Sequence, residues 1–141
     1  MELNNPSVFP IGDELPELFS KYFTGQAYLL PMTDRGGPIA NVTFSPGCRN
    51  NWHIHHKGGQ ILLVTGGKGW YQEWGKPAQK LLPGDVINIA PEVKHWHGAA
   101  ADKWFSHLAV EIPAEDASNE WLEAVGDEEY KILNKGGVID E

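Results

Sequence analysis

The sequence predicts an all-β domain, a sandwich or barrel of about eight or nine short strands, with an arm before it and short helices after it. The chain has 141 residues, a length typical of one domain, so we expect a single domain over residues 1–141. Its 16 glycines and 10 prolines indicate many turns. Short runs of alternating apolar and polar residues recur between these turns, which is the pattern of half-buried strands.

Each expected strand is bounded by turn-forming residues. The first twenty residues are rich in proline and glycine and predict an arm. The alternation in residues 39–44 places Ala40, Val42 and Phe44 on one face. The expected strands span residues 22–32 with a bend at Gly25, 39–44, 52–56, 60–65, 69–74, 80–82, 86–90, 94–98 and 104–112.

The period changes after Pro113 and predicts helices over residues 116–133. The run 116–119 is suited to capping a first helix, on which Trp121, Leu122 and Val125 would form an apolar stripe. Asp127 would cap a last short helix through Leu133, followed by a loose tail.

The composition excludes several classes of protein. With a formal net charge of −8 and a pI near 5.2, the chain lacks the basic surface that nucleic-acid binding requires. No run approaches the roughly 18 apolar residues of a membrane span, and the N-terminus does not resemble a secretory signal. The single cysteine, Cys48, forms no internal disulfide and excludes a Cys-based zinc site. We therefore expect a cytoplasmic protein.

The negative charge is concentrated at the C-terminus. Residues 111–141 hold ten acidic and two basic residues, whereas residues 41–110 hold seven basic and four acidic ones. The second segment also contains all six histidines. The overall acidity therefore does not argue against an anionic partner for this segment.

Two His-x-His patterns lie on expected strands. In a strand, residues i and i+2 point to the same face, so His53 and His55 can bind one metal ion together. Gln60 begins the next strand and can reach the same place, and a barrel would bring His95 of the second pattern close. A single His-x-His is more often a structural or surface pair, but this combination favours a metal site.

The spacing of these residues resembles the two motifs of the cupin superfamily. Gly47, His53, His55, Gln60 and Gly67 match the first motif, with Gln60 where Glu is usual. The run from Gly84 to His95 matches the second, with Glu92 in place of a common glycine. The chain is most similar to a group of small cupins that includes manganese-dependent bacterial hydroxynitrile lyases and carboxymuconolactone decarboxylase-related cupins. This resemblance covers residues 24–112 and implies a double-stranded β-helix, the jelly-roll barrel.

The resemblance also implies the roles of individual residues. The metal ligands would be His53, His55, Gln60 and His95. His97 and His107 would be the proton-transfer groups of a lyase. Ala40, Val42 and Glu111 would line the substrate pocket, where Glu111 differs from the neutral residue expected in the lyases.

Three neutral imidazoles and a neutral amide leave the charge of a divalent ion uncompensated. We therefore expect a strong Lewis acid that favours an anion or alkoxide, and we expect Gln60→Glu to raise metal affinity and weaken anion binding. Manganese is the expected metal, and the N and O donors also suit Fe, Ni, Co or Zn.

Three functions stay open at this point. The first is a metal-dependent lyase acting on a small hydroxyl or carbonyl substrate, with His97 or His107 as general base. The second is a dioxygenase or other redox cupin, and the third is a small-ligand-binding cupin without activity. His107 could equally be a hydrogen-bonded core histidine. We also expect a homodimer through barrel edges, with residues 70–74 and 22–30 as candidate edges.

Overall fold

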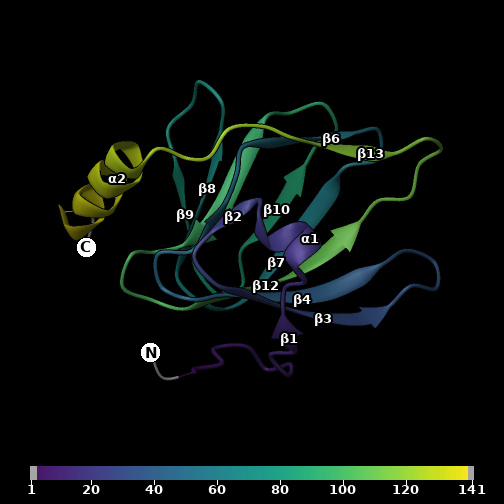
Figure 1. Ribbon diagram of the computed structural model, residues 1–141, viewed down its shortest axis with the longest axis horizontal. Helices are drawn as coiled ribbons and strands as arrows, with labels where there is room; N and C mark the ends of the chain where they lie inside the picture. The colour runs from purple at the N-terminus through teal and green to yellow at the C-terminus, as the bar shows by residue number, and fades with distance from the viewer. Residues whose placement is uncertain (1–2, 140–141) are drawn as a thin grey trace.

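Two antiparallel sheets face each other in the computed structural model, which describes residues 3–139 (Figure 1). The first sheet has the strand order β1-β3-β4-β12-β7-β10. Its strands are β1 (Asp13–Glu14), β3 (Ala27–Thr33), β4 (Ile39–Phe44), β12 (Phe105–Glu111), β7 (Gln60–Gly67) and β10 (Val86–Ile89). These strands supply one wall of the barrel interior.

The second sheet supplies the opposite wall and has the order β13-β6-β11-β5-β2, with β8 pairing with β11 and β9 with β8. Its strands are β13 (Ser118–Trp121), β6 (His53–His56), β11 (His95–Ala99), β5 (Arg49–Asn50), β2 (Phe23–Thr24), β8 (Gly69–Glu73) and β9 (Gln79–Leu81). The two helices are α1 (Glu17–Ser20) and α2 (Asp127–Ile139). This arrangement confirms the expected all-β jelly-roll barrel with an N-terminal arm.

The bend expected at Gly25 divides the first predicted strand into β2 and β3. Gly25 has a φ of 92°, and a Cβ there would lie 2.9 Å from the Cα of Cys48. Both the backbone conformation and the close approach therefore require glycine. This turn carries the chain from one sheet to the other.

The helix expected over residues 116–125 is wrong. Residues 118–121 form β13, which pairs with β6 in the register Ser118↔His56 and Trp121↔His53. The apolar residues after Pro113 fit a helical stripe locally, but the open edge of β6 offers backbone hydrogen bonds that an isolated short helix cannot match. The correction matters because β13 brings Asn119 and Trp121 to the histidines.

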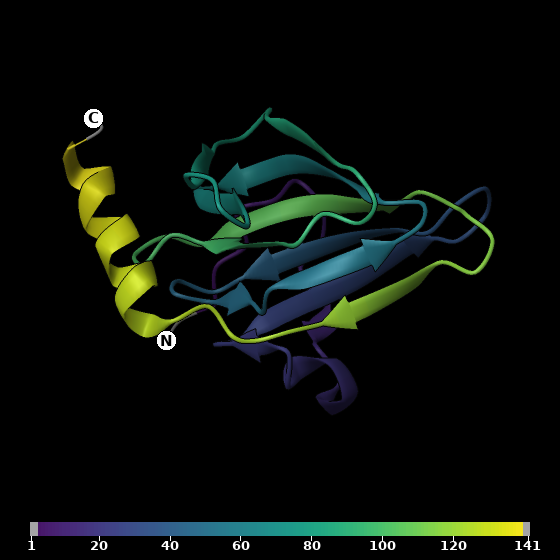
Figure 2. The same ribbon diagram turned by 90° about the horizontal axis from the view of Figure 1, so that it is seen from above.

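One helix follows, not two. It begins at Asp127 as expected but continues to Ile139, beyond the predicted end at Leu133. The Asn134 amide oxygen, placed by the sequence in a loose tail, accepts hydrogen bonds from Trp70 Nε1 at 3.2 Å and from the Ala101 amide at 2.8 Å. These bonds fix α2 at one end of the barrel (Figure 2).

Two apolar clusters stabilise the barrel. The interior cluster includes Phe44, Leu62 and Phe105, all fully buried. The second, which we call the tryptophan cluster, packs between the second sheet and α2 and consists of Trp52, Trp70, Trp96, Ala100, Val125 and Tyr130. Burying such large aromatic surfaces is a main source of stability. Trp52, Trp70 and Trp96 thus have a packing role.

The expected dimer edge at residues 70–74 is not free, because β8 pairs with both β11 and β9. In the 22–30 segment, β3 is likewise paired on both sides, although β1 covers only two of its residues. Within residues 3–139, no helix combines the length and the apolar character that crossing a bilayer requires.

Candidate metal centre

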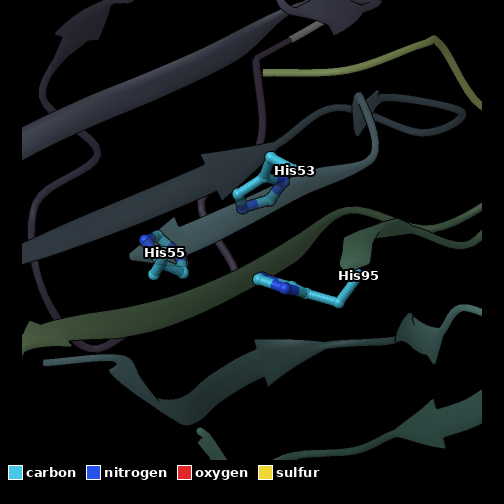
Figure 3. Close-up of side chains that lie close together, drawn as sticks. All are labelled: His53, His55 and His95. Atoms are coloured by element: carbon cyan, nitrogen blue, oxygen red, sulfur yellow. The ribbon is translucent and has the colours of Figure 1, made fainter. Parts of the chain in front are cut away.

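Three histidines converge between β6 and β11 (Figure 3). The alternation of β6 buries His53 and His55 on one face, and the pairing of β6 with β11 sets His95 opposite His53. The three ligand atoms lie within 4.8 Å of one another. Bonds of about 2.1 Å to one ion would bring such atoms within about 4.2 Å, so a small contraction is sufficient.

The outer ring nitrogen of each histidine is already bonded. His53 Nδ1 donates to the Asn51 carbonyl at 2.8 Å, and His95 Nδ1 donates to the Val93 carbonyl at 2.9 Å. His55 Nδ1 donates to Asn119 Oδ1 at 2.7 Å. These acceptors fix the tautomer, so that each Nε2 carries a lone pair. Nε2 of His55 and Nε2 of His95 are buried and have no hydrogen-bond partner, so both atoms are available as metal ligands.

Gln60 lines the same cavity from β7 of the first sheet. Its Nε2 donates to Glu111 Oε1 at 3.1 Å, and its Oε1 is buried without a partner. Oxygen is therefore the free end of this amide. Three imidazole nitrogens and one amide oxygen fit a divalent transition metal, with His53, His55, His95 and Gln60 as the residues that would hold it.

Burial keeps two of the three histidines, His53 and His95, neutral at neutral pH. It lowers the pKa of His53 well below its usual range, and the neighbouring His95 adds to this effect. It also lowers the pKa of His95, to about 4. Neutral imidazoles bind metal without first losing a proton, so the site is prepared for an ion.

His97 and His107 lie beside the cluster, with their ring centroids 4.9 Å apart. The Asn50 amide oxygen accepts the His97 backbone N–H at 2.9 Å, so its NH₂ group faces His97 Nε2 at 3.2 Å. Nε2 must then accept, and the ring proton lies on Nδ1, which is buried without a partner. His97 is therefore a proton donor at Nδ1.

His107 has no hydrogen-bond partner at either ring nitrogen, although it is almost completely buried. Burial lowers the pKa of His107 to about 4. The backbone of Leu108 acts in the opposite direction, but its effect is smaller than that of burial. Its ring is both part of the buried core and part of the cavity wall. A neutral imidazole with a free lone pair is a proton acceptor.

A cavity of about 550 Å³ opens onto these groups. Ala40 and Val42 from β4 and Glu111 from β12 line it. So do seven other residues that the sequence singled out or that are bonded to them: Asn50, His53, His55, Gln60, His97, His107 and Asn119. Its outer part is apolar and is formed by Leu15, Phe19, Phe23, Leu29, Pro31, Met32, Ile39 and Trp121. The cavity thus offers an apolar wall for the body of a ligand and a polar end near the histidines.

Sequence reasoning missed three residues of this site. Asn119 orients His55, Trp121 stacks on His53 with centroids 4.6 Å apart, and Asn50 fixes the tautomer of His97. The first two were assigned to a helix, and Asn50 lies on a two-residue strand that carries no periodic signal. His56 is half-exposed and lies between Glu92 and Glu120, at 2.6 and 2.7 Å.

Comparison with known proteins identifies the family. The chain is 40% identical over 114 residues to the (R)-mandelonitrile lyase of Granulicella tundricola, an alignment covering 78% of this chain and 86% of the lyase. It is 39% identical to a cupin-like protein from Thermotoga maritima, with a TM-score of 0.83 over 92% of this chain and 98% of that one.

A cupin-2 domain from Rhodospirillum rubrum, 16% identical, shares the fold, with a TM-score of 0.65 over 99% of this chain and 95% of the other. No protein-family model matches the chain. The sequence identities, the barrel and the histidine cluster agree: the chain belongs to the cupin superfamily, in the family that includes the (R)-mandelonitrile lyase of Granulicella tundricola.

Proposed function

We propose that this protein is a metal-dependent lyase that cleaves and forms cyanohydrins or similar small hydroxyl compounds with an aromatic or branched apolar body. The observation that carries this proposal is the pair of buried imidazoles, His97 and His107, which have unpartnered nitrogens and line the same cavity as His53, His55 and Gln60. The relative named as an (R)-mandelonitrile lyase supports the reaction type.

His97 and His107 differ in what they can do with a proton. His107, neutral and without partners, takes the hydroxyl proton of the substrate as general base. The carbon–carbon bond to cyanide then breaks, its electron pair leaves with cyanide, and the carbonyl forms. Cyanide takes up the proton that His107 has just accepted and leaves as HCN, which returns His107 to its neutral form. The Nδ1–H of His97 in the cavity wall donates a hydrogen bond to this leaving group.

The other residues of the cavity bind and orient the substrate. A divalent ion held by His53, His55, Gln60 and His95, which we propose is manganese, supplies Lewis acidity toward the substrate oxygen. Trp121 and Val42 offer an apolar surface for an aromatic ring. The apolar wall also excludes water from the reacting atoms, which strengthens the polar interactions among them.

Turnover of mandelonitrile by metal-loaded protein tests this proposal. The metal-free protein is loaded with Mn²⁺, Fe²⁺, Co²⁺, Ni²⁺ or Zn²⁺, and benzaldehyde release is followed by absorbance. We expect turnover with at least one metal, lost in His107→Gln and retained in the matched control His56→Gln, whose histidine lies outside the cavity. Oxygen consumption with an electron-rich phenol would instead indicate a redox cupin, and affinity without turnover a binding protein.

We also propose a homodimer. Val86, which is 60% exposed, lies on β10 at the edge of the first sheet, and Leu82, which is 43% exposed, lies shortly before this strand. Together they offer an apolar contact along this edge. A dimer mass in sedimentation supports this assembly, and a monomer mass at micromolar concentration contradicts it.

A further inference from the structure

Glu111 faces Gln60 directly across two paired strands. It is the last residue of β12, Gln60 is the first residue of β7, and the register aligns the two. The carboxylate is half-buried in the cavity wall, where Gln60 Nε2 donates to Glu111 Oε1 at 3.1 Å. A carboxylate thus contacts the one proposed ligand that carries no ring.

This contact selects the orientation of the Gln60 amide. An amide has a donor end and an acceptor end of nearly equal size, and an ionised carboxylate accepts hydrogen bonds only. Glu111 therefore takes the NH₂ end of Gln60, and the oxygen end stays free, buried and without a partner. Without an acceptor at position 111, the amide could equally present its NH₂ group, which cannot bind a metal.

Glu111 also brings charge to a donor set that has none. The proposed ligands are three imidazoles and an amide, whereas Glu111 supplies a carboxyl group that is in contact with the amide. The other carboxyl in the cavity lining, Asp34, belongs to an exposed loop at the mouth. The expectation of an anionic partner rested on the ligands alone and left this carboxylate out.

We infer that Glu111 is a positioning and specificity-determining residue, which holds the Gln60 oxygen free for the metal and places a negative charge beside the site. The charge strengthens metal binding and repels small anions, so the cavity prefers neutral hydroxyl or carbonyl ligands. This inference rests on the metal dependence of the proposed function and not on its lyase chemistry.

The inference changes the expected effect of Gln60→Glu. Next to Glu111 that substitution sets two carboxylates about one hydrogen-bond length apart, and they cannot both be ionised at low cost. The repulsion between the two carboxylates offsets part of the attraction that the added charge has for a metal ion. We therefore expect a small gain in metal affinity from Gln60→Glu alone.

Four proteins separate orientation from charge: the wild type, Gln60→Glu, Glu111→Gln and the reversed pair Gln60→Glu/Glu111→Gln. Titration calorimetry gives the Mn²⁺ affinity of each. Glu111→Gln keeps an acceptor for Gln60 but removes the charge, and we expect it to weaken Mn²⁺ binding by about 10- to 100-fold. The reversed pair returns the charge and should recover the wild-type affinity or exceed it.

Azide binding to the Co²⁺-loaded proteins tests the second half of the inference. The visible spectrum of Co²⁺ reports the anion, and we expect Glu111→Gln to bind azide at least tenfold more tightly than the wild type. Glu111→Leu, which removes both acceptor and charge, should lose more Mn²⁺ affinity than Glu111→Gln. Circular dichroism checks that each variant is folded, and the reversed pair provides the comparison if Glu111→Gln is not.

Equal Mn²⁺ and azide affinities in the wild type and Glu111→Gln would overturn the inference while leaving the metal site intact. A wild type that binds none of the five metals would overturn the metal dependence of the proposed function, and the inference with it. Normal metal binding without mandelonitrile turnover would overturn only the lyase chemistry.

Discussion

The tryptophan cluster and the cavity differ in whether their buried polar atoms have hydrogen-bond partners. In the tryptophan cluster three polar atoms have partners: Trp96 Nε1 donates to Gln72 at 2.9 Å, Trp70 Nε1 to Asn134, and the Tyr130 hydroxyl to the Ala99 carbonyl. Arg49 Nε, beside Tyr130, is the exception.

Around the cavity, six buried side-chain atoms have no partner. They are His55 Nε2, Gln60 Oε1, His95 Nε2, His97 Nδ1 and both ring nitrogens of His107. A buried polar atom without a partner costs about 1–3 kcal/mol, so a fold retains several of them together only where something other than stability requires them. We therefore infer that the tryptophan cluster stabilises the fold, whereas the cavity serves binding and chemistry at a cost in stability.

His107→Leu tests the cavity side of this comparison and has the largest expected effect. Removing the proposed base should lower lyase turnover by about 10²- to 10⁴-fold. Because the imidazole is buried without partners, the same change should leave the free energy of unfolding of the metal-free protein unchanged or raise it by about 1–3 kcal/mol. Turnover assays and urea unfolding measure the two effects, and a strongly destabilised variant would show that His107 is a structural residue.

Trp70→Ala tests the other side. This side chain is 4% exposed and packs in the tryptophan cluster, so its truncation should lower the free energy of unfolding by about 3–5 kcal/mol. Mn²⁺ affinity of the folded fraction should stay within about threefold of the wild type, because Trp70 lies outside the ligand set and its hydrogen bonds. Loss of metal binding without loss of stability would contradict the division between the two regions.

The pH dependence of stability should reveal the buried imidazoles. His107 has a pKa of about 4 in the folded protein and about 6.5 when unfolded, so the unfolded chain binds a proton first as the pH falls. The free energy of unfolding is then at its full value above pH 6.5 and falls between pH 6.5 and 4, by about 3 kcal/mol for this residue. Urea unfolding in EDTA across this range measures the slope.

Two variants assign this slope. His107→Leu should reduce it, since the titrating group is removed. The contribution of His56 to the free energy of unfolding changes with pH in the opposite direction. Its hydrogen bonds to Glu120 and Glu92 raise its pKa, so the protonated imidazole stabilises the folded protein at acid pH. This contribution is complete below pH 6.5 and is lost as the pH rises through the raised pKa, so His56→Gln should leave the slope between pH 6.5 and 4 unchanged. An identical slope in His107→Leu and in the wild type would contradict the assignment.

The sequence predicted those structural features that depend on residues close together in the chain, and missed those that depend on pairing between distant strands. The alternation in β6 placed His53 and His55 on one face, because the period of a strand is a local property. The prediction of a helix over residues 116–125 was wrong because β13 forms only by pairing with β6, some 60 residues earlier in the chain. The Gln60–Glu111 contact depends on the register of β7 and β12, which no local pattern specifies.

A substitution of Asn119 has the smallest expected effect. It tests whether a residue that only hydrogen-bonds to a ligand contributes to the metal affinity. Its Oδ1 accepts from His55 Nδ1 at 2.7 Å and so holds the ring with Nε2 toward the other histidines. Asn119→Leu removes this acceptor, and changes of this kind weaken metal binding by about 10- to 100-fold. Since Asn119 is solvent-exposed, water can replace its oxygen, and we expect a loss at the lower limit, about tenfold.

Two controls make this small effect interpretable by Mn²⁺ titration calorimetry. Asn119→Asp keeps an acceptor for His55 and should retain the wild-type affinity or increase it, because a carboxylate partner makes the imidazole a stronger ligand. Ser118→Ala changes the preceding exposed residue of β13 and should have no effect. A loss of more than a hundredfold in Asn119→Leu would mean that β13 itself detaches from β6. In that case the same variant would also lose the stacking of Trp121 on His53, which Trp fluorescence would detect.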